Sequence, residues 1–322
     1  MNNNSFEEIG EQLKAAKSIL LYTHVNMDGD TLGSAVALCI VLRKMGKECH
    51  ILLEDEMHDN LKFLDKGYCT YDQDVIETPD VSMCIDCGEL GRFPKRADKF
   101  KTGKVSICVD HHRTTEPFCQ FNYISPETAA TGELIYKLIK AMGQEIDKET
   151  GEAIFAAITT DTGNFQYSNT TKQSHEIVAA LYDAGIDSNA VSVEIYETVR
   201  IQKLMVRNKI LDDMLLACDG RLAIAYVTQD MLKQTGARME ETEGIVGELR
   251  GIENVEVAVF LKEDADNTVY VSFRSKHSAD VANVAAKFGG GGHKKAAGCT
   301  LHDITLSKAF DMIKDATMEI FA

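Results

Sequence analysis

The stretch Ser18-Ile19-Leu20-Leu21-Tyr22-Thr23-His24-Val25-Asn26-Met27-Asp28-Gly29-Asp30 joins an apolar run directly to a cluster of polar residues. The apolar run predicts a buried strand over 18–25, and apolar side chains at helical spacing predict a helix over 31–47. A strand, a tight turn and a helix in this order form the unit from which parallel sheets are built. The polar end of the stretch would therefore lie at the carboxyl end of a strand, where open α/β folds bind ligands.

The same alternation continues through the first half of the chain. Further strands are predicted over 48–54, 81–87, 104–110 and 118–124, and helices over 128–142, 150–160 and 173–184. Because strands alternate with helices, we predict an α/β fold with a doubly wound, mostly parallel sheet.

The pattern changes after Asp219-Gly220. Strands are predicted there over 221–228, 255–262 and 268–274, and helices over 239–250, 279–288 and 305–320. We therefore predict a first domain at 1–190, a connecting helix at 191–217 and a second, smaller α+β domain at 218–322.

Composition indicates a cytoplasmic protein. The chain has 322 residues, of which 44% are hydrophobic, yet no apolar run approaches the ~18 residues that span a membrane. The N-terminus lacks the basic and apolar regions of a signal peptide. The nine cysteines are scattered singly, which is typical of a reducing compartment. We expect no membrane partner.

The charge is strongly acidic but uneven. The net charge of −16 argues against binding to long nucleic acid, which needs a row of cations along the backbone. Between Val271 and Thr300, however, five cations stand against one anion, so this segment carries +4 and the remainder −20. The basic segment suggests a small anionic ligand bound locally, although chance clustering on a solvated surface would look the same.

Carboxylates and imidazoles follow several of the predicted elements. The candidate metal ligands are His24, Asp28, Asp30, Asp86, His111 and Asp161. Gathered at one edge of a sheet, these groups would repel or titrate one another unless cations held them, and two divalent ions would balance the four carboxylates. Individually, the acids on turns could equally be helix caps or turn formers. Oxygen with some imidazole suits Mn²⁺ best, with Mg²⁺, Co²⁺ or zinc as alternatives.

Three residues are candidates for catalysis. Asp86 ends an apolar strand, where an acid is costly unless it is paired or bound to metal, and it would bridge the two ions. Asp110 would orient a histidine through its ring N–H, and His112 would contact a phosphate or protonate a leaving oxygen. Cys84 and Cys87 surround Asp86 with a C-x-x-C spacing, which could indicate a redox or zinc site, but no second cysteine pair accompanies them.

A run of four glycines, Gly289-Gly290-Gly291-Gly292, stands before His293. Such a run costs conformational entropy and is expected where backbone N–H groups wrap an anion, or else in a flexible linker. The candidate substrate-binding residues are Arg274, Ser275, Gly290, Gly291, Gly292 and His293. Neither a dinucleotide-binding glycine motif nor a P-loop is present.

Together these segments resemble the DHH/DHHA1 phosphoesterases, which are named for their Asp-His-His motif and for a C-terminal domain with a Gly-Gly-Gly-His motif. Asp110-His111-His112 and Gly290-Gly291-Gly292-His293 match them, in the family's order. Within the family the chain looks most like the two-domain nanoRNase-type enzymes. Those act as oligoribonucleases on very short RNA and as phosphatases on 3′-phosphoadenosine 5′-phosphate.

The resemblance implies a role for each motif. His24, Asp28 and Asp86 would hold one Mn²⁺, and the other would lie among Asp30, Asp86, His111 and Asp161. The first domain would be catalytic. The second would bind the nucleotide through Arg274 and the glycine segment.

We therefore expect a metal-dependent phosphodiesterase that releases mononucleotides from very short oligoribonucleotides, and that also acts on nucleoside bisphosphates. The alternatives are a phosphodiesterase for linear dinucleotides derived from cyclic dinucleotides and a nucleotide-binding module without turnover. A homodimer is compatible with the sequence, although no feature demands one.

Overall fold

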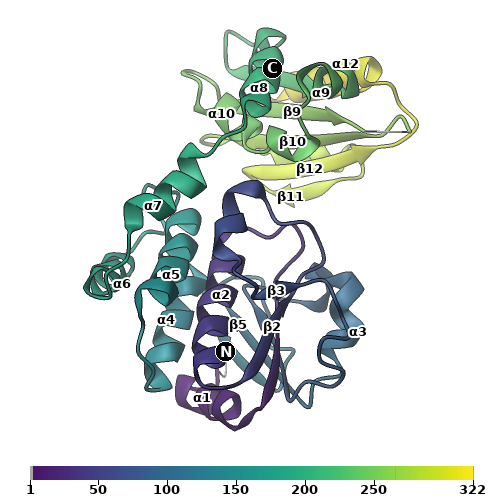
Figure 1. Ribbon diagram of the computed structural model, residues 1–322. Coiled ribbons are helices and arrows are strands. Elements are labelled where there is room, and N and C mark those ends of the chain that lie inside the picture. Colours follow the sequence, from purple (N-terminus) through teal and green to yellow (C-terminus); the bar gives the residue numbers. More distant parts are fainter. Residues whose placement is uncertain (1–2, 265, 322) are drawn as a thin grey trace. The chain divides into compact units, whose positions relative to one another are not determined.

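The computed structural model describes residues 3–264 and 266–321. The chain divides into two compact units, Met1–Thr198 and Val199–Ala322, each built around a six-stranded sheet (Figure 1). In the described ranges, none of the helices is long and apolar enough to cross a membrane.

The first unit contains a parallel sheet of strand order β3-β2-β1-β4-β5-β6. Its strands are β1 (Ser18–Tyr22), β2 (Glu48–Leu52), β3 (Cys69–Thr70), β4 (Val81–Ile85), β5 (Val105–Asp110) and β6 (Phe121–Ile124). The chain runs outward from β1 to β3 and then returns to β4 on the other side of β1. This reversal confirms the predicted doubly wound fold. Open α/β folds bind ligands where the strand order reverses, which here is at the carboxyl ends of β1 and β4.

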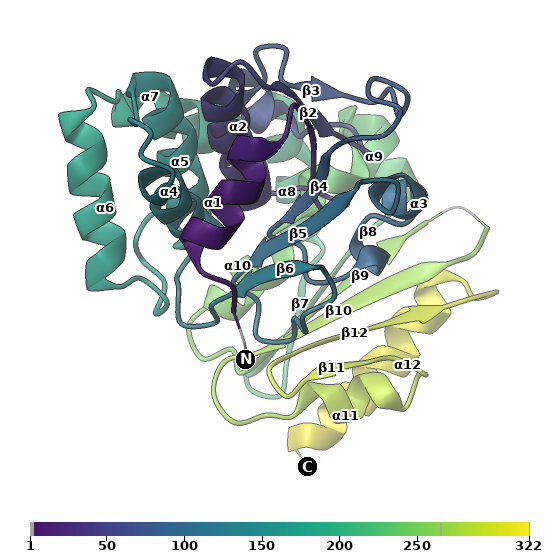
Figure 2. The same ribbon diagram turned by 90° about the horizontal axis from the view of Figure 1, so that it is seen from below.

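Both faces of this sheet are covered. The helices α1 (Phe6–Ala15), α2 (Gly29–Lys44), α4 (Thr131–Ala141), α5 (Lys148–Asp161) and α6 (Lys172–Asp183) lie on one side, and the short α3 (Ala97–Phe100) lies on the other (Figure 2). Side chains alternate along β1, so Ile19 and Leu21 join the core beneath the large helices while Leu20 and Tyr22 join the second core. Burial on both faces explains why these strands read as continuous apolar runs.

The prediction of one connecting helix over 191–217 is wrong. The segment contains the end of α7 (Ser188–Ser192), a π-helical turn at Val193–Glu197, α8 (Ile201–Asp212) and a strand, β7 (Leu215–Ala217). Thr198 and Arg200 leave the helical conformation, with ψ of 77° and 137°. The β-branched neighbours Thr198 and Val199 lower helix propensity at this break, and β7 forms because a partner strand lies beside it.

The second unit contains a sheet of order β11-β12-β10-β9-β8-β7, antiparallel except between β8 and β9. Its remaining strands are β8 (Leu222–Val227), β9 (Val257–Glu263), β10 (Val269–Ser275), β11 (Gly291–His293) and β12 (Ala296–Leu301). The predicted smaller α+β architecture is confirmed. The glycine segment, however, is partly a strand rather than a loop, because β12 offers it a partner.

Helices pack on both faces of this second sheet. α8, α9 (Gln229–Thr235) and α10 (Ile245–Gly251) form one core with β8 and β9, while α11 (Val281–Ala286) and α12 (Leu306–Met318) form the other (Figure 2). The helix predicted over 239–250 is interrupted. Its first turn is a 3-10 helix at Met239–Thr242, and Gly244 then adopts a φ of +90°, which only glycine takes up readily.

Candidate metal centre

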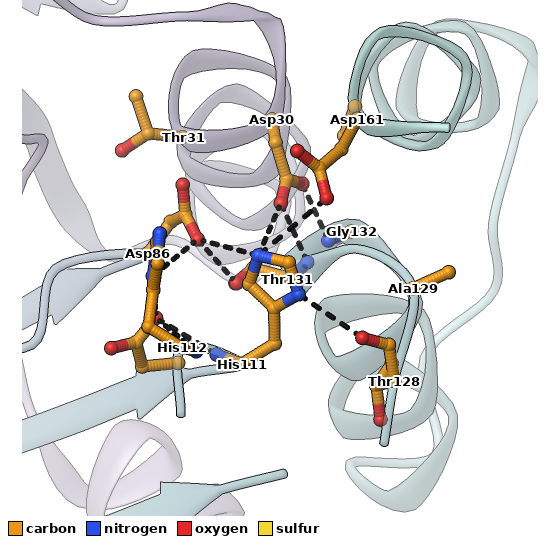
Figure 3. Close-up of polar contacts among 12 residues, drawn as sticks. Asp30, Thr31, Asp86, His111, His112, Thr128, Ala129, Thr131, Gly132 and Asp161 are labelled. Atoms are coloured by element: carbon orange, nitrogen blue, oxygen red, sulfur yellow. Dashed lines mark hydrogen bonds and ion pairs between the residues drawn. The ribbon is translucent and has the colours of Figure 1, made fainter. Parts of the chain in front are cut away.

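The predicted metal ligands are carried by element ends in the first unit. His24 follows β1, Asp28 and Asp30 stand at the start of α2, and Asp86 follows β4. His111 follows β5, and Asp161 is the last residue of α5. Figure 3 shows Asp30, Asp86, His111 and Asp161 directed toward one another.

The structure brings these six residues into two groups that share Asp86. His24 Nε2 lies 3.7 Å from Asp28 Oδ2 and 3.7 Å from Asp86 Oδ2. His111 Nε2 lies 3.5 Å from the other oxygen of Asp86, 3.8 Å from Asp30 Oδ2 and 3.6 Å from Asp161 Oδ2. Ligand atoms lie within 4.8 Å of one another in three sets of residues: His24, Asp28 and Asp86; Asp30, His111 and Asp161; and Asp86, His111 and His112. The two oxygens of Asp86 thus face different groups.

Both histidines present Nε2 to the acids because Nδ1 is already occupied. His24 Nδ1 lies 2.8 Å from the Val25 carbonyl oxygen. His111 Nδ1 lies 3.0 Å from the Thr128 carbonyl oxygen (Figure 3). A carbonyl oxygen only accepts, so Nδ1 carries the hydrogen and Nε2 has a free lone pair in the neutral ring. This is the tautomer that a metal ion needs.

The helix N-termini hold the carboxylates of this site. Thr131 N–H donates to Asp30 Oδ2 at 2.7 Å, and Gly132 N–H donates to Oδ1 at 2.9 Å. The Thr131 hydroxyl also donates to Asp86 Oδ1 at 2.8 Å (Figure 3). Helix N-termini favour negative charge, so α4 fixes both acids. The sequence analysis did not identify Thr131 and Gly132 as part of the site. Their backbone N–H groups act as donors, and every residue type except proline carries such a group.

Asp28 serves two purposes, so the helix-cap and metal-ligand interpretations are compatible. Its Oδ1 accepts hydrogen bonds from the N–H groups of Asp30 and Thr31 at 3.1 and 3.0 Å and so caps α2. Its other oxygen faces His24. The N-terminus of α2 therefore holds the Asp28 carboxylate in place.

Asp86 has a left-handed backbone, with φ of +58°. Few residues other than glycine adopt this conformation, and its cost is usually met at functional sites. The neighbouring strand β5 and helix α2 secure it: Asp86 N–H donates to the Val109 carbonyl at 3.0 Å, and the Thr31 hydroxyl donates to the Ile85 carbonyl at 2.9 Å. The strained turn leaves the carboxylate facing His24 and His111.

Asp110 is buried and orients His112 rather than His111. Its Oδ1 accepts the Nδ1–H of His112 at 2.8 Å, and its Oδ2 accepts a hydrogen bond from the Thr115 hydroxyl. The hydrogen bond to Asp110 is the main cause that raises the pKa of His112 to about 9, against the opposing effect of burial. Nδ1 of His112 is thus a donor, and its Nε2 is left for other partners.

The proton affinities of the cluster are shifted by burial and by the neighbouring charges. Burial, and then the charges of Asp86, Asp161 and Asp28, raise the pKa of Asp30 well above its usual value. Burial raises the pKa of Asp161 to about 6. Burial opposes protonation of His24, but its contacts with Asp28 and Asp86 outweigh this and raise its pKa to about 10. Groups that compete for protons in this way, with four carboxylates and two imidazoles converging, fit a pair of divalent metal ions.

The candidate substrate-binding residues lie in the second unit. Arg274 on β10 pairs in register with Ala296 on β12, which pairs with His293 on β11. Residues in register across antiparallel strands share a face, so Arg274 and His293 point to the same side of the sheet. Ser275 points to the other side, where it is buried and its hydroxyl donates to the Ala279 carbonyl at 2.8 Å.

Gly290, just before β11, and Gly292, within it, meet a packing requirement. Gly292 has a φ of +141°, and an added Cβ there would lie 2.5 Å from the Ala296 carbonyl oxygen. Gly290 is similarly crowded against Gly298 and Cys299 of β12, whereas Gly291 is exposed with open space beside it. Two of the three therefore allow close strand pairing, and Gly291 leaves its backbone accessible beside the exposed His293.

Two family models match the chain, the N-terminal domain of the DHH family at residues 18–158 and the DHHA1 domain at residues 219–320. The chain belongs to the DHH/DHHA1 family. The predicted resemblance is confirmed, and all six candidate metal ligands except Asp161 fall within the matched DHH region.

Relatives of this DHH/DHHA1 protein match it along nearly its whole length. A protein of Thermus thermophilus named bifunctional oligoribonuclease and PAP phosphatase NrnA is 31% identical, over 97% of this chain and 93% of its own. A Bacillus subtilis protein of the same name is 27% identical, over 88% and 90%. The crystal structure of an exopolyphosphatase-related protein from Bacteroides fragilis superposes with a TM-score of 0.89 at 28% identity, covering 98% and 96%.

Proposed function

We propose that this protein is a two-metal phosphoric ester hydrolase that releases mononucleotides from very short oligoribonucleotides and also dephosphorylates 3′-phosphoadenosine 5′-phosphate. The observation that carries the proposal is the position of Asp86, whose two oxygens face two separate ligand groups. The full-length similarity to the two NrnA proteins supports the substrate class. An acidic surface also suits a short substrate, because it repels long nucleic acid.

His24, Asp28 and Asp86 would hold one metal ion, and Asp30, Asp86, His111 and Asp161 the other. When bound, two divalent ions acidify a water and neutralise charge on a phosphate. We favour Mn²⁺, with Mg²⁺ or Co²⁺ as substitutes, because the ligands combine hard oxygens with imidazole.

His112 is the proposed proton donor. Its Nδ1–H is held by Asp110, and this hydrogen bond is the main cause that raises the pKa of the ring to about 9. Nε2–H can therefore donate to a phosphate oxygen or protonate the leaving oxygen. Asp110 is a positioning residue, because it acts on the substrate only through His112.

The second domain, 218–322, is proposed to bind the nucleotide. Arg274 and His293 share a sheet face, and the accessible backbone at Gly291 can approach a phosphate. Ser275 would contribute indirectly, by holding the turn that follows β10. The nine free cysteines support an enzyme of the cytoplasm.

The test is release of mononucleotides from RNAs of two to five nucleotides, beside 3′-phosphoadenosine 5′-phosphate, a linear dinucleotide of cyclic-dinucleotide origin, and pyrophosphate. Each is measured with Mn²⁺ and with chelator. We expect Mn²⁺-dependent cleavage of the short RNAs and of the bisphosphate. Hydrolysis of pyrophosphate alone, or binding without any turnover, would overturn the proposal.

A further inference from the structure

A pocket of about 420 Å³ opens beside the metal centre, and nothing described so far uses it. It lies entirely within the first unit, between the loop after β4 and the loop after β5. Gly88, Glu89, Arg92, Thr114 and Thr115 line it together with Asp86 and His112. The pocket therefore adjoins the proposed bridging acid and the proposed proton donor.

Arg92 presents an unpartnered guanidinium to this pocket. Its side chain is exposed and makes no hydrogen bond or ion pair with any residue of the described ranges. Arg96, four residues later, behaves differently: it is buried and bonds to the carbonyls of Thr23 and Leu52 and to the Glu54 carboxylate. Arg96 thus has a structural role, whereas the fold makes no use of the Arg92 donors.

The backbone of Arg92 is nevertheless well fixed. Its carbonyl accepts the N–H of Val25 at 2.8 Å, and its own N–H donates to the Glu89 carbonyl at 3.1 Å. Val25 follows His24 directly, so the wall that carries Arg92 is tied to the loop of the first ligand group. A fixed backbone with a free planar fork of five donors is well suited to bidentate binding of a phosphate.

We propose that this pocket is a subsite for a second phosphate of the substrate, the one next to the phosphate under attack, and that Arg92 binds it. This inference rests on the proposed function and deepens it. It accounts for one site that takes both a bisphosphate nucleoside and a short oligonucleotide, since each carries a phosphate beyond the one hydrolysed. The Thr114 hydroxyl is a further donor, and the Glu89 carboxylate on the same wall can accept a sugar hydroxyl.

The test compares two substrates with the same scissile bond in the Mn²⁺-loaded enzyme: a diribonucleotide with a 5′-phosphate and the same diribonucleotide without it. We expect Arg92→Gln to lower kcat/KM for the phosphorylated substrate by about tenfold or more and to change the other less than about twofold. Arg92→Lys should fall between, because it keeps the charge but loses the fork. The melting temperature should stay unchanged, since the side chain has no partner in the fold.

Arg113→Gln is the charge-matched control. Arg113 is also exposed and follows His112, but it does not line the pocket, and its nearest acid, Glu127, is 3.9 Å away. Equal losses for Arg92→Gln and Arg113→Gln would mean a general effect of charge and would overturn the subsite. The subsite would also be overturned if Arg92→Gln lowered kcat/KM equally for both substrates, or if it lowered neither.

A failure of the proposed function gives a different result. If the wild type cleaves no nucleotide at all, that function is wrong. Calorimetric binding of 3′-phosphoadenosine 5′-phosphate and of adenosine 5′-monophosphate then decides the subsite. The subsite is supported only if Arg92→Gln weakens binding of 3′-phosphoadenosine 5′-phosphate and leaves binding of adenosine 5′-monophosphate unchanged.

Discussion

At the scale of single residues, Asp86 matters most to the metal centre. We predict that Asp86→Ala removes both ions and lowers turnover by more than about a hundredfold. Loss of a residue that only hydrogen-bonds to a metal ligand costs up to about a hundredfold, and loss of a ligand shared by two ions should cost more. Metal content per chain and turnover measure this. Asp74, an exposed acid, is the control, and its alanine variant should keep both ions. Two bound ions with near-normal turnover in Asp86→Ala would contradict the shared position of this residue.

The raised pKa values predict how metal binding depends on pH. A metal ion binds the deprotonated groups, so its affinity should fall as the pH drops through about 6, where Asp161 takes up a proton. It should rise toward higher pH as His24, with a pKa of about 10, gives up its proton more readily. Calorimetric titration with Mn²⁺ across this range tests the sign. Asp161→Asn should remove the step near pH 6, and an affinity that does not vary with pH would refute the linkage.

At the scale of elements, the start of α4 acts as part of the metal centre. Thr131→Val keeps the side-chain shape and the backbone donors to Asp30 but removes the hydroxyl that bonds to Asp86. We predict a loss of metal affinity of about tenfold and a loss of about 1 kcal/mol in the free energy of unfolding. Thr131→Ser should restore the affinity. If the serine and valine variants bind metal equally, the hydroxyl has no part in the site.

The close packing of α2 on α5 depends on Gly33. The two helices lie side by side (Figure 1), and a Cβ at Gly33 would meet the Ala153 carbonyl oxygen at 2.5 Å. We predict that Gly33→Ala destabilises the first unit by about 1–3 kcal/mol, although alanine is the better helix former. Urea denaturation measures this. Gly247 in α10 has open space around it, so Gly247→Ala should be neutral or stabilising, and similar effects of both variants would count against the packing argument.

At the scale of the whole molecule, charge should decide the length of the substrate. The net charge is −16, whereas the segment 271–300 carries five cations against one anion, a local net charge of +4. We predict that single-stranded RNA of about fifty nucleotides competes poorly with a trinucleotide. KM for the trinucleotide should rise only weakly with salt concentration, because one or two phosphates are contacted. A plot of log KM against log salt concentration should have a slope of ~0.7 for each contact. Strong inhibition by long RNA at low salt would contradict this.

Much of this molecule could be predicted from local pattern. Apolar runs of strand length, which alternate with segments whose apolar residues recur at helical spacing, indicated the doubly wound sheet. Such periodicity shows which face of each element is buried. The chemistry of His24, Asp28, Asp30, Asp86, His111 and Asp161, placed after predicted strands and helices, was enough to suggest a shared site. The structure brings all six together.

Other features depend on partners that lie far away in the sequence. The donors from Thr131 and Gly132 to Asp30 span about a hundred residues and belong to the backbone, so no residue pattern announces them. The strand β11 exists because β12 lies beside it, and the left-handed turn at Asp86 is held by Val109 of the neighbouring strand. The sequence thus specified which groups do chemistry and which faces are buried. Register, backbone donors and strained turns were settled by folding, because they arise from pairing between segments that local periodicity does not record.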